Sequence, residues 1–220
     1  MKWNRFQVRK ALYYAIPLSI IFLDVWVFIE LSEELNENAL HAFDDSFIQL
    51  IQGQISEPLT ILMIWITTLA NSSILIFFGI VLVTVLLYKK QAALAVFIAV
   101  TNLLGGGFNW LLKSVFSRER PNLEVLIEQG GYSFPSGHAM GSIIFYGSLS
   151  VVIIMMTNRK SISYLTGVLS SLLILLIGIS RIYLGVHFPS DIVAGFAAGA
   201  AWLTICISGY LLYRTKSVKN

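Results

Sequence analysis

Residues 139–183, AMGSIIFYGSLSVVIIMMTNRKSISYLTGVLSSLLILLIGISRIY, contain two long apolar runs on either side of the basic pair Arg159 and Lys160. An apolar helix of about 20 residues is long enough to cross the roughly 30 Å hydrocarbon core of a bilayer. Basic residues between two such helices are typical of a cytoplasmic turn. The stretch therefore predicts two transmembrane helices, residues 139–156 and 164–183, joined on the inner side of a membrane.

The rest of the chain has the same apolar character. Of its 220 residues, 56% are hydrophobic and 12% are charged, and the mean hydropathy is +0.76. These values exclude a soluble globular domain and a disordered chain, and the single cysteine, Cys206, excludes a disulfide scaffold. Further spans are predicted at residues 12–31, 74–88, 92–112 and 192–213. We expect an all-α, polytopic membrane protein with six transmembrane helices in a single domain, residues 1–220.

A shorter apolar segment, residues 59–70, has about twelve residues, which favours a short interfacial or re-entrant helix between the first two spans over another span. With six spans, both termini and eleven of the fifteen basic residues lie on one side, which the positive-inside rule makes cytoplasmic. A seventh span would put Lys89 and Lys90 opposite the N-terminal basic cluster. His41, in an outer loop rich in Asn and Glu, is expected to be solvated. The eleven residues are Lys2, Arg5, Arg9, Lys10, Lys89, Lys90, Arg159, Lys160, Arg214, Lys216 and Lys219.

The other four basic residues, Lys113, Arg118, Arg120 and Arg181, are predicted on the outer side. Each has an ordinary structural explanation when taken alone, such as a lysine that snorkels from a helix end to the membrane surface. Three of them, however, recur close to histidines or an Arg-Pro pair, all at the same membrane face, which favours a functional site. The three stretches are KSVFSRERP (residues 113–121), PSGH (135–138) and SRIYLGVHFPSD (180–191).

These residue types suit the binding of a phosphate ester. Its negative oxygens favour fixed cations and backbone N–H donors, and Lys113, Arg120 and Arg181 are such cations. Ser136 and Gly137 lie where the span at 139–156 begins, so we expect their N–H groups and the helix dipole to point at a bound anion.

The two histidines in these stretches can divide the chemistry of phosphate hydrolysis. A neutral imidazole attacks phosphorus best when its other nitrogen donates to a carboxylate, and His187 has Asp191 four residues ahead for this purpose. His138 is then free to act as general acid to the leaving group and later as base for water. Every charge-stabilising role has a protein residue, so we expect neither a metal nor another cofactor.

Together the three stretches resemble the three signature motifs of the type-2 phosphatidic acid phosphatase superfamily, K-x6-RP, PSGH and SR-x5-H-x3-D. Lys113, Arg120 and Pro121 match the first motif, residues 135–138 the second, and Ser180, Arg181, His187 and Asp191 the third. The resemblance implies a six-helix membrane core and metal-independent hydrolysis through a phosphohistidine. The size and the outward site resemble bacterial members that act on phosphatidylglycerol phosphate or undecaprenyl pyrophosphate.

Other functions stay open at this point. Phosphatidate or diacylglycerol pyrophosphate are alternative substrates, and an anion or lipid transporter is the alternative that is not an enzyme. The clustering of the charges at one face and not at the midplane argues against transport. The expected partners are a lipid phosphate and the bilayer, with no nucleic acid, and the oligomeric state is left open. Asp24, inside the first span, has no assigned role, and Arg118 is either a headgroup ligand or a charge at the rim of the site.

Overall fold

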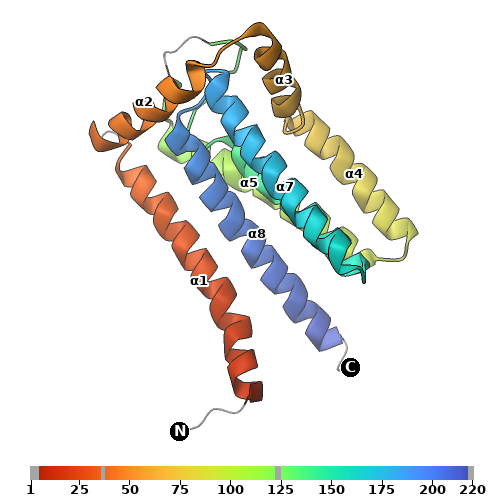
Figure 1. Ribbon diagram of the computed structural model, residues 1–220. Helices are drawn as coiled ribbons and strands as arrows, with labels where there is room; N and C mark the ends of the chain where they lie inside the picture. Colours follow the sequence, from red (N-terminus) through yellow and green to blue (C-terminus); the bar gives the residue numbers. More distant parts are fainter. Residues whose placement is uncertain (1–4, 36–37, 122–124, 218–220) are drawn as a thin grey trace.

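The computed structural model describes residues 5–35, 38–121 and 125–217, and within these ranges the chain forms helices and no strands. Most of the helices lie side by side along one axis (Figure 1). In chain order they are α1 (Arg5–Glu33), α2 (Asn38–Gln52), α3 (Glu57–Thr68), α4 (Ser72–Tyr88), α5 (Ala92–Phe116), α6 (Gly137–Met156), α7 (Lys160–Tyr183) and α8 (Pro189–Ser217).

Five of the described helices, α1, α5, α6, α7 and α8, are long and apolar enough to cross a membrane. Helices α3 and α4 meet this criterion only as a pair, which is bent by 46° at a short break. The prediction of an all-α membrane protein is confirmed, and the described helices give the predicted six spans when α3 and α4 are counted together as one crossing. The short helix predicted at residues 59–70 is present as α3, but it belongs to this bent pair with α4.

Helix α2 was not predicted, because residues 38–52 were interpreted as part of an outer loop. Its apolar residues alternate between two faces at helical spacing, with Leu40 and Ile48 buried and Phe43, Phe47 and Leu50 exposed. Charged residues between them lower the mean hydropathy, so a search for spans passes over the segment. In Figure 1, α2 lies across the end of the bundle, away from both chain termini.

Helix α8 packs closely against α6 and also against α1. A Cβ atom on Gly195 would lie 2.7 Å from the carbonyl oxygen of Ser136, so only glycine allows the two backbones to approach this closely. The amide of Ser136 also donates to the carbonyl oxygen of Asp191, at 3.0 Å. This packing brings the PSGH stretch and the first turn of α8 together.

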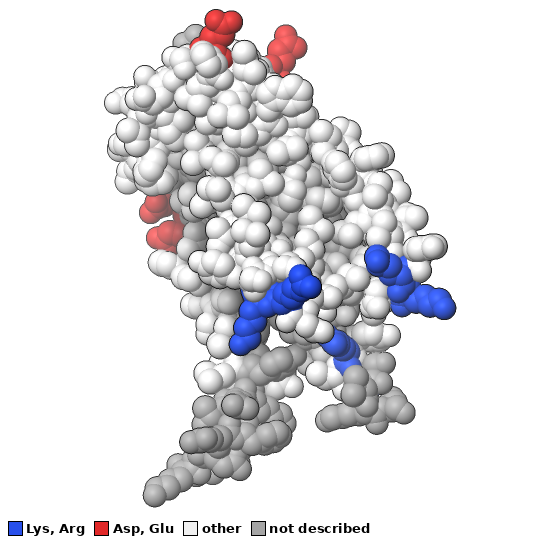
Figure 2. Space-filling view, turned by 45° about the vertical axis from the view of Figure 1, so that its right-hand side comes forward, with Lys and Arg blue, Asp and Glu red and all other residues white. Residues whose placement is uncertain are grey.

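The charged side chains separate along the bundle axis. The turns that follow α4 and α6 carry Lys89, Lys90, Arg159 and Lys160, and they lie at the same end as both chain termini (Figure 1). Figure 2 shows the basic side chains on one face below all the acidic ones. Of the predicted cytoplasmic set, Lys2 and Lys219 lie outside the described residues, and for Arg5, Arg9 and Lys10 the structure describes the backbone alone.

Candidate active site

The site is built around His187, in the turn between α7 and α8. Gly185 allows this turn, because its φ of +73° lies in the left-handed region that favours glycine. His187 is only 2% exposed, and its Nδ1 lies 3.3 Å from Oδ2 of Asp191 in the first turn of α8. Burial lowers the pKa of His187 to about 4, although Asp191 opposes this shift. The imidazole is therefore neutral at neutral pH.

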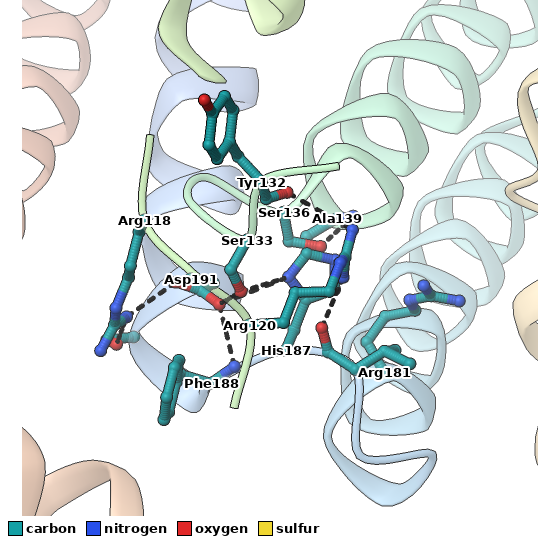
Figure 3. A network of polar contacts seen from close by, with 12 residues as sticks. Arg118, Arg120, Tyr132, Ser133, Ser136, Ala139, Arg181, His187, Phe188 and Asp191 are labelled. Atoms are coloured by element: carbon teal, nitrogen blue, oxygen red, sulfur yellow. Dashed lines mark hydrogen bonds and ion pairs between the residues drawn. The ribbon is translucent and has the colours of Figure 1, made fainter. Parts of the chain in front are cut away.

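Both carboxylate oxygens of Asp191 have hydrogen-bond donors. Arg118 Nη1 donates to Oδ1 at 2.7 Å. Oδ2 accepts the amide of Phe188 at 2.9 Å and also the hydroxyl of Ser133, which itself lies 3.3 Å from His187 Nδ1. Figure 3 shows Asp191 between Arg118 on one side and Ser133 with His187 on the other. The carboxylate is thus held so that one oxygen faces the imidazole.

Arg120 lies on the opposite side of the imidazole from Asp191. Its Nη1 is 3.4 Å from His187 Nε2 and 2.6 Å from the carbonyl oxygen of Val186. Its Nε and Nη2 donate to the carbonyl oxygens of Gly131 and Gly130, at 3.0 and 2.9 Å. Burial lowers the pKa of Arg120, and Asp191 opposes the shift. These contacts fix a guanidinium beside Nε2 of His187, where an anion would lie.

Two further cations surround this centre. Lys113, in the last turn of α5, donates through Nζ to the carbonyl oxygen of Tyr132 at 2.5 Å. Arg181, only 1% exposed, donates through Nη1 to Thr67 and through Nη2 to Gln129, both at 2.8 Å. Its Nε is buried and has no hydrogen-bond partner among the described residues. Arg181 is thus oriented by α3 and by the loop before α6.

The start of α6 corrects one expectation. The amide of Ser136 is engaged with Asp191, and its hydroxyl accepts from the amide of Ala139 at 3.4 Å as the helix N-cap. Ser136 therefore does not offer its N–H to a phosphate, because that donor is already used. The amides of Gly137 and His138 open the first turn, where a helix has no internal acceptors for its N–H groups.

His138, in the same turn, has a partner from the break between α3 and α4. Its Nε2 lies 3.0 Å from Oδ1 of Asn71. Because an amide oxygen only accepts hydrogen bonds, this contact assigns the proton to Nε2. Asn71 was not predicted as a site residue, because 67 residues separate it from the histidine in the chain.

A cavity of about 670 Å³ joins these groups. One end is lined by Lys113, Arg120, Gly137, His138 and His187, so five of the predicted site residues meet there. Arg181, Asp191 and Ser136 are not part of the lining and support it from behind. The other end runs between α4 and α5, and its apolar lining includes Leu75, Ile76, Ile80, Val83, Ile98 and Leu103.

Arg118, which the sequence left open between a headgroup ligand and a rim charge, is paired with two carboxylates in the structure. Its side chain is 9% exposed and forms ion pairs with Asp191 at 2.7 Å and with Asp44 of α2 at 3.1 Å. Asp44 was not found from the sequence. One feature of the sequence points to a buried Asp44. It lies four residues from both Leu40 and Ile48, so on a helix the carboxylate shares a face with these two apolar residues.

Comparisons with known proteins give the family to which this bundle and its cavity belong. A model of the PAP2 superfamily matches residues 90–214. Phosphatidylglycerophosphatase B of Bacillus subtilis is 34% identical over 96 residues, which cover 41% of this chain and 45% of that protein. Undecaprenyl-diphosphatase of Sulfolobus acidocaldarius is 25% identical over 198 residues, which cover 87% of this chain and 88% of that protein.

A solved structure agrees with the fold. The PAP2-type phosphatidylglycerolphosphate phosphatase of Bacillus subtilis superposes with a TM-score of 0.79 at 24% identity, covering 87% of this chain and 94% of that one. The chain therefore belongs to the PAP2 superfamily. It is a multi-pass membrane hydrolase of the lipid phosphatase class.

Proposed function

We propose that this lipid phosphatase removes phosphate from phosphatidylglycerol phosphate or undecaprenyl pyrophosphate through a phosphohistidine on His187, without a metal ion. The cavity carries this proposal, because it joins two histidines and two cations at one end to an apolar channel at the other. A charged end next to an apolar channel suits a phosphate attached to a long hydrocarbon chain. We further propose that the described helices form one integral-membrane phosphatase domain.

The first step follows from the environment of His187. With its Nδ1 proton donated to Asp191, the lone pair of Nε2 faces the cavity and attacks phosphorus. The bond between phosphorus and the leaving oxygen breaks, and that oxygen takes a proton from His138, which enters this step as an imidazolium and leaves it neutral. Lys113 and Arg120 hold the negative oxygens, together with the amide of Gly137, and Arg181 adds its positive charge from behind the cavity lining. Asp191 stabilises the positive charge that forms on the imidazole.

In the second step the phosphohistidine is hydrolysed. Neutral His138 takes a proton from water, the water oxygen bonds to phosphorus, and the bond from phosphorus to Nε2 of His187 breaks. Inorganic phosphate leaves and both histidines return to their starting states. Each step therefore needs only groups that line or support the cavity.

The substrate reaches the site from the outer leaflet, with both termini on the cytoplasmic side. The basic turns at the opposite end of the bundle support this orientation, because such residues collect in the cytoplasm. Moving an acyl chain into water costs about 0.8 kcal/mol per CH₂. The chain therefore stays in lipid, and the channel between α4 and α5 is a side entrance for it.

The test is phosphate release in detergent from four lipids: phosphatidylglycerol phosphate, undecaprenyl pyrophosphate, phosphatidate and diacylglycerol pyrophosphate. We expect release from one or both of the first two, with His187→Ala as the inactive control. Faster release from phosphatidate or diacylglycerol pyrophosphate would favour the alternative substrates. Release from none of these lipids by the folded protein would contradict the proposal.

A further inference from the structure

Helix α2 places a carboxylate in the protein interior. Asp44 has no exposed surface, and a buried carboxylate is costly unless hydrogen bonds or cations replace its hydration. Here Oδ1 accepts the amide of Ser190 at 2.8 Å, while Oδ2 accepts the Ser190 hydroxyl at 2.7 Å and Arg118 Nη2 at 3.1 Å. Burial raises the pKa of Asp44, and these contacts oppose the shift. Asp44 thus joins α2 to the first turn of α8.

Arg118 connects Asp44 to the centre of the site. Its Nη1 donates to Asp191 Oδ1 at 2.7 Å and to the Ser190 hydroxyl at 2.9 Å, while its Nη2 donates to Asp44. The guanidinium also lies over the ring of Phe188, 4.0 Å from its centroid. A planar fork with several donors is suited to bridge two carboxylates in this way.

The direction of these contacts separates Arg118 from the phosphate-binding cations. Lys113 and Arg120 line the cavity, whereas Arg118 does not. Its donors point at two buried carboxylates, on the far side of Asp191 from His187 (Figure 3). Arg118 therefore acts on the reaction only through Asp191.

We propose that Arg118 and Asp44 are positioning residues for the nucleophile. Arg118 holds Oδ1 of Asp191, which leaves Oδ2 directed at His187 Nδ1, and Asp44 holds Arg118 in place. This inference rests on the proposed role of His187. It makes α2, which none of the three motifs covers, part of the catalytic apparatus.

Two physical consequences follow. Without Arg118, Oδ1 of Asp191 loses its charged partner, so the carboxylate no longer stabilises the imidazole in one orientation. A cation also disfavours protonation of the groups around it. The groups that face His187 are Asp191, Arg120, Arg181 and Ser133, and Arg118 adds its charge from behind Asp191. Its removal allows the Asp191–His187 pair to take up a proton at higher pH.

The experiment compares Arg118→Gln, Arg118→Lys and Asp44→Asn with wild type, using an aryl phosphate in detergent across pH. For Arg118→Gln we expect kcat to fall by about tenfold or more with KM within about threefold, and the acid limb of kcat/KM to move to higher pH. Lysine keeps the positive charge but lacks the planar guanidinium with its several donors. Arg118→Lys should therefore lower kcat without moving the acid limb of kcat/KM. Asp44→Asn should lower kcat less than Arg118→Gln. Glu119→Gln, an exposed neighbour, is the matched control.

Thermal melting in detergent identifies variants that fold. If Arg118→Gln does not fold, Arg118→Lys is the variant that tests the inference. A wild-type kcat in Arg118→Lys would overturn it. A rise in KM at unchanged kcat would also overturn it, because Arg118 would then be a headgroup ligand. Different results would contradict the proposed function: a wild-type protein that releases no phosphate, or a His187→Ala variant that remains active.

Discussion

Oδ1 of Asn71 lies 3.0 Å from Nε2 of His138, across the gap between the α3–α4 break and the start of α6. Next to the break, the carbonyl oxygen of Leu69 accepts the hydroxyl of Tyr146 in α6, at 2.9 Å. The broken span is therefore attached to the same helix that carries His138. An acceptor oxygen at this position holds the N–H of Nε2, so the bend of the chain orients the ring of the proposed general acid.

Asn71→Leu should lower kcat on a lipid phosphate by about tenfold or more, because an unoriented His138 protonates the leaving alkoxide poorly. On an aryl phosphate, whose leaving group needs little help, the loss should be smaller. Initial rates on the two substrates measure the ratio. Ser73→Ala, an exposed position in the same helix start, is the matched control. Equal losses on both substrates would mean that Asn71 serves only the fold.

The two histidines should differ when each is replaced by alanine. His187→Ala removes the nucleophile, so no phosphoenzyme forms on any substrate. His138→Ala removes proton transfer, which typically contributes about 10²–10⁴-fold, and should retain turnover of an activated aryl phosphate. Acid-quenched labelling with a ³²P-phosphate substrate measures the phosphoenzyme directly. Equal residual activity of the two variants would contradict the assignment of roles.

The pKa of His187 should set the pH dependence of the activity on the acid side. Its pKa is lowered from 6.5 to about 4 by burial, so the nucleophile stays neutral down to the lower value. On an aryl phosphate, the acid limb of kcat/KM should lie near pH 4, with His41→Ala, an exposed histidine, as the control. A limb near 6.5 would contradict this.

The same shift affects stability. The unfolded chain binds more protons than the folded one between the two pKa values. Stability is therefore lost as the pH falls from 6.5 towards 4, and thermal melting in detergent should show it.

Chelation should leave the activity unchanged. Within the described residues no group of three or more His, Cys, Asp or Glu side chains could hold a metal ion. The charge of the phosphate is instead balanced by Lys113, Arg120 and Arg181. Phosphate release is measured before and after dialysis against EDTA. Loss of activity on chelation, restored by added Mg²⁺, would contradict the mechanism.

The proposed orientation can be tested with single cysteines in a Cys206→Ser background. A cysteine in place of Glu128, in the exposed loop before α6, should react with an impermeant thiol reagent in intact cells. A cysteine in place of Lys89, in the turn after α4, should not react until the cells are opened. The reverse pattern would place the site on the cytoplasmic leaflet.

The sequence alone was sufficient for the helices and for the set of residues at one end of the bundle. A bilayer restricts each apolar run to a crossing, so the side on which Lys113, His138 and His187 emerge follows from the order of the spans. The His187–Asp191 pair also follows from local spacing, because four residues separate them at a helix start.

Contacts between distant elements were decided only by the tertiary structure. Arg118 and Asp44 are 74 residues apart, and Asn71 and His138 are 67 apart. Hydropathy shows that a helix crosses the membrane, but it is almost independent of the rotation of that helix about its axis. That rotation, together with the bend between α3 and α4, determines which polar side chain meets which. The partners that orient Asp191 and His138 therefore became visible only in the packed bundle.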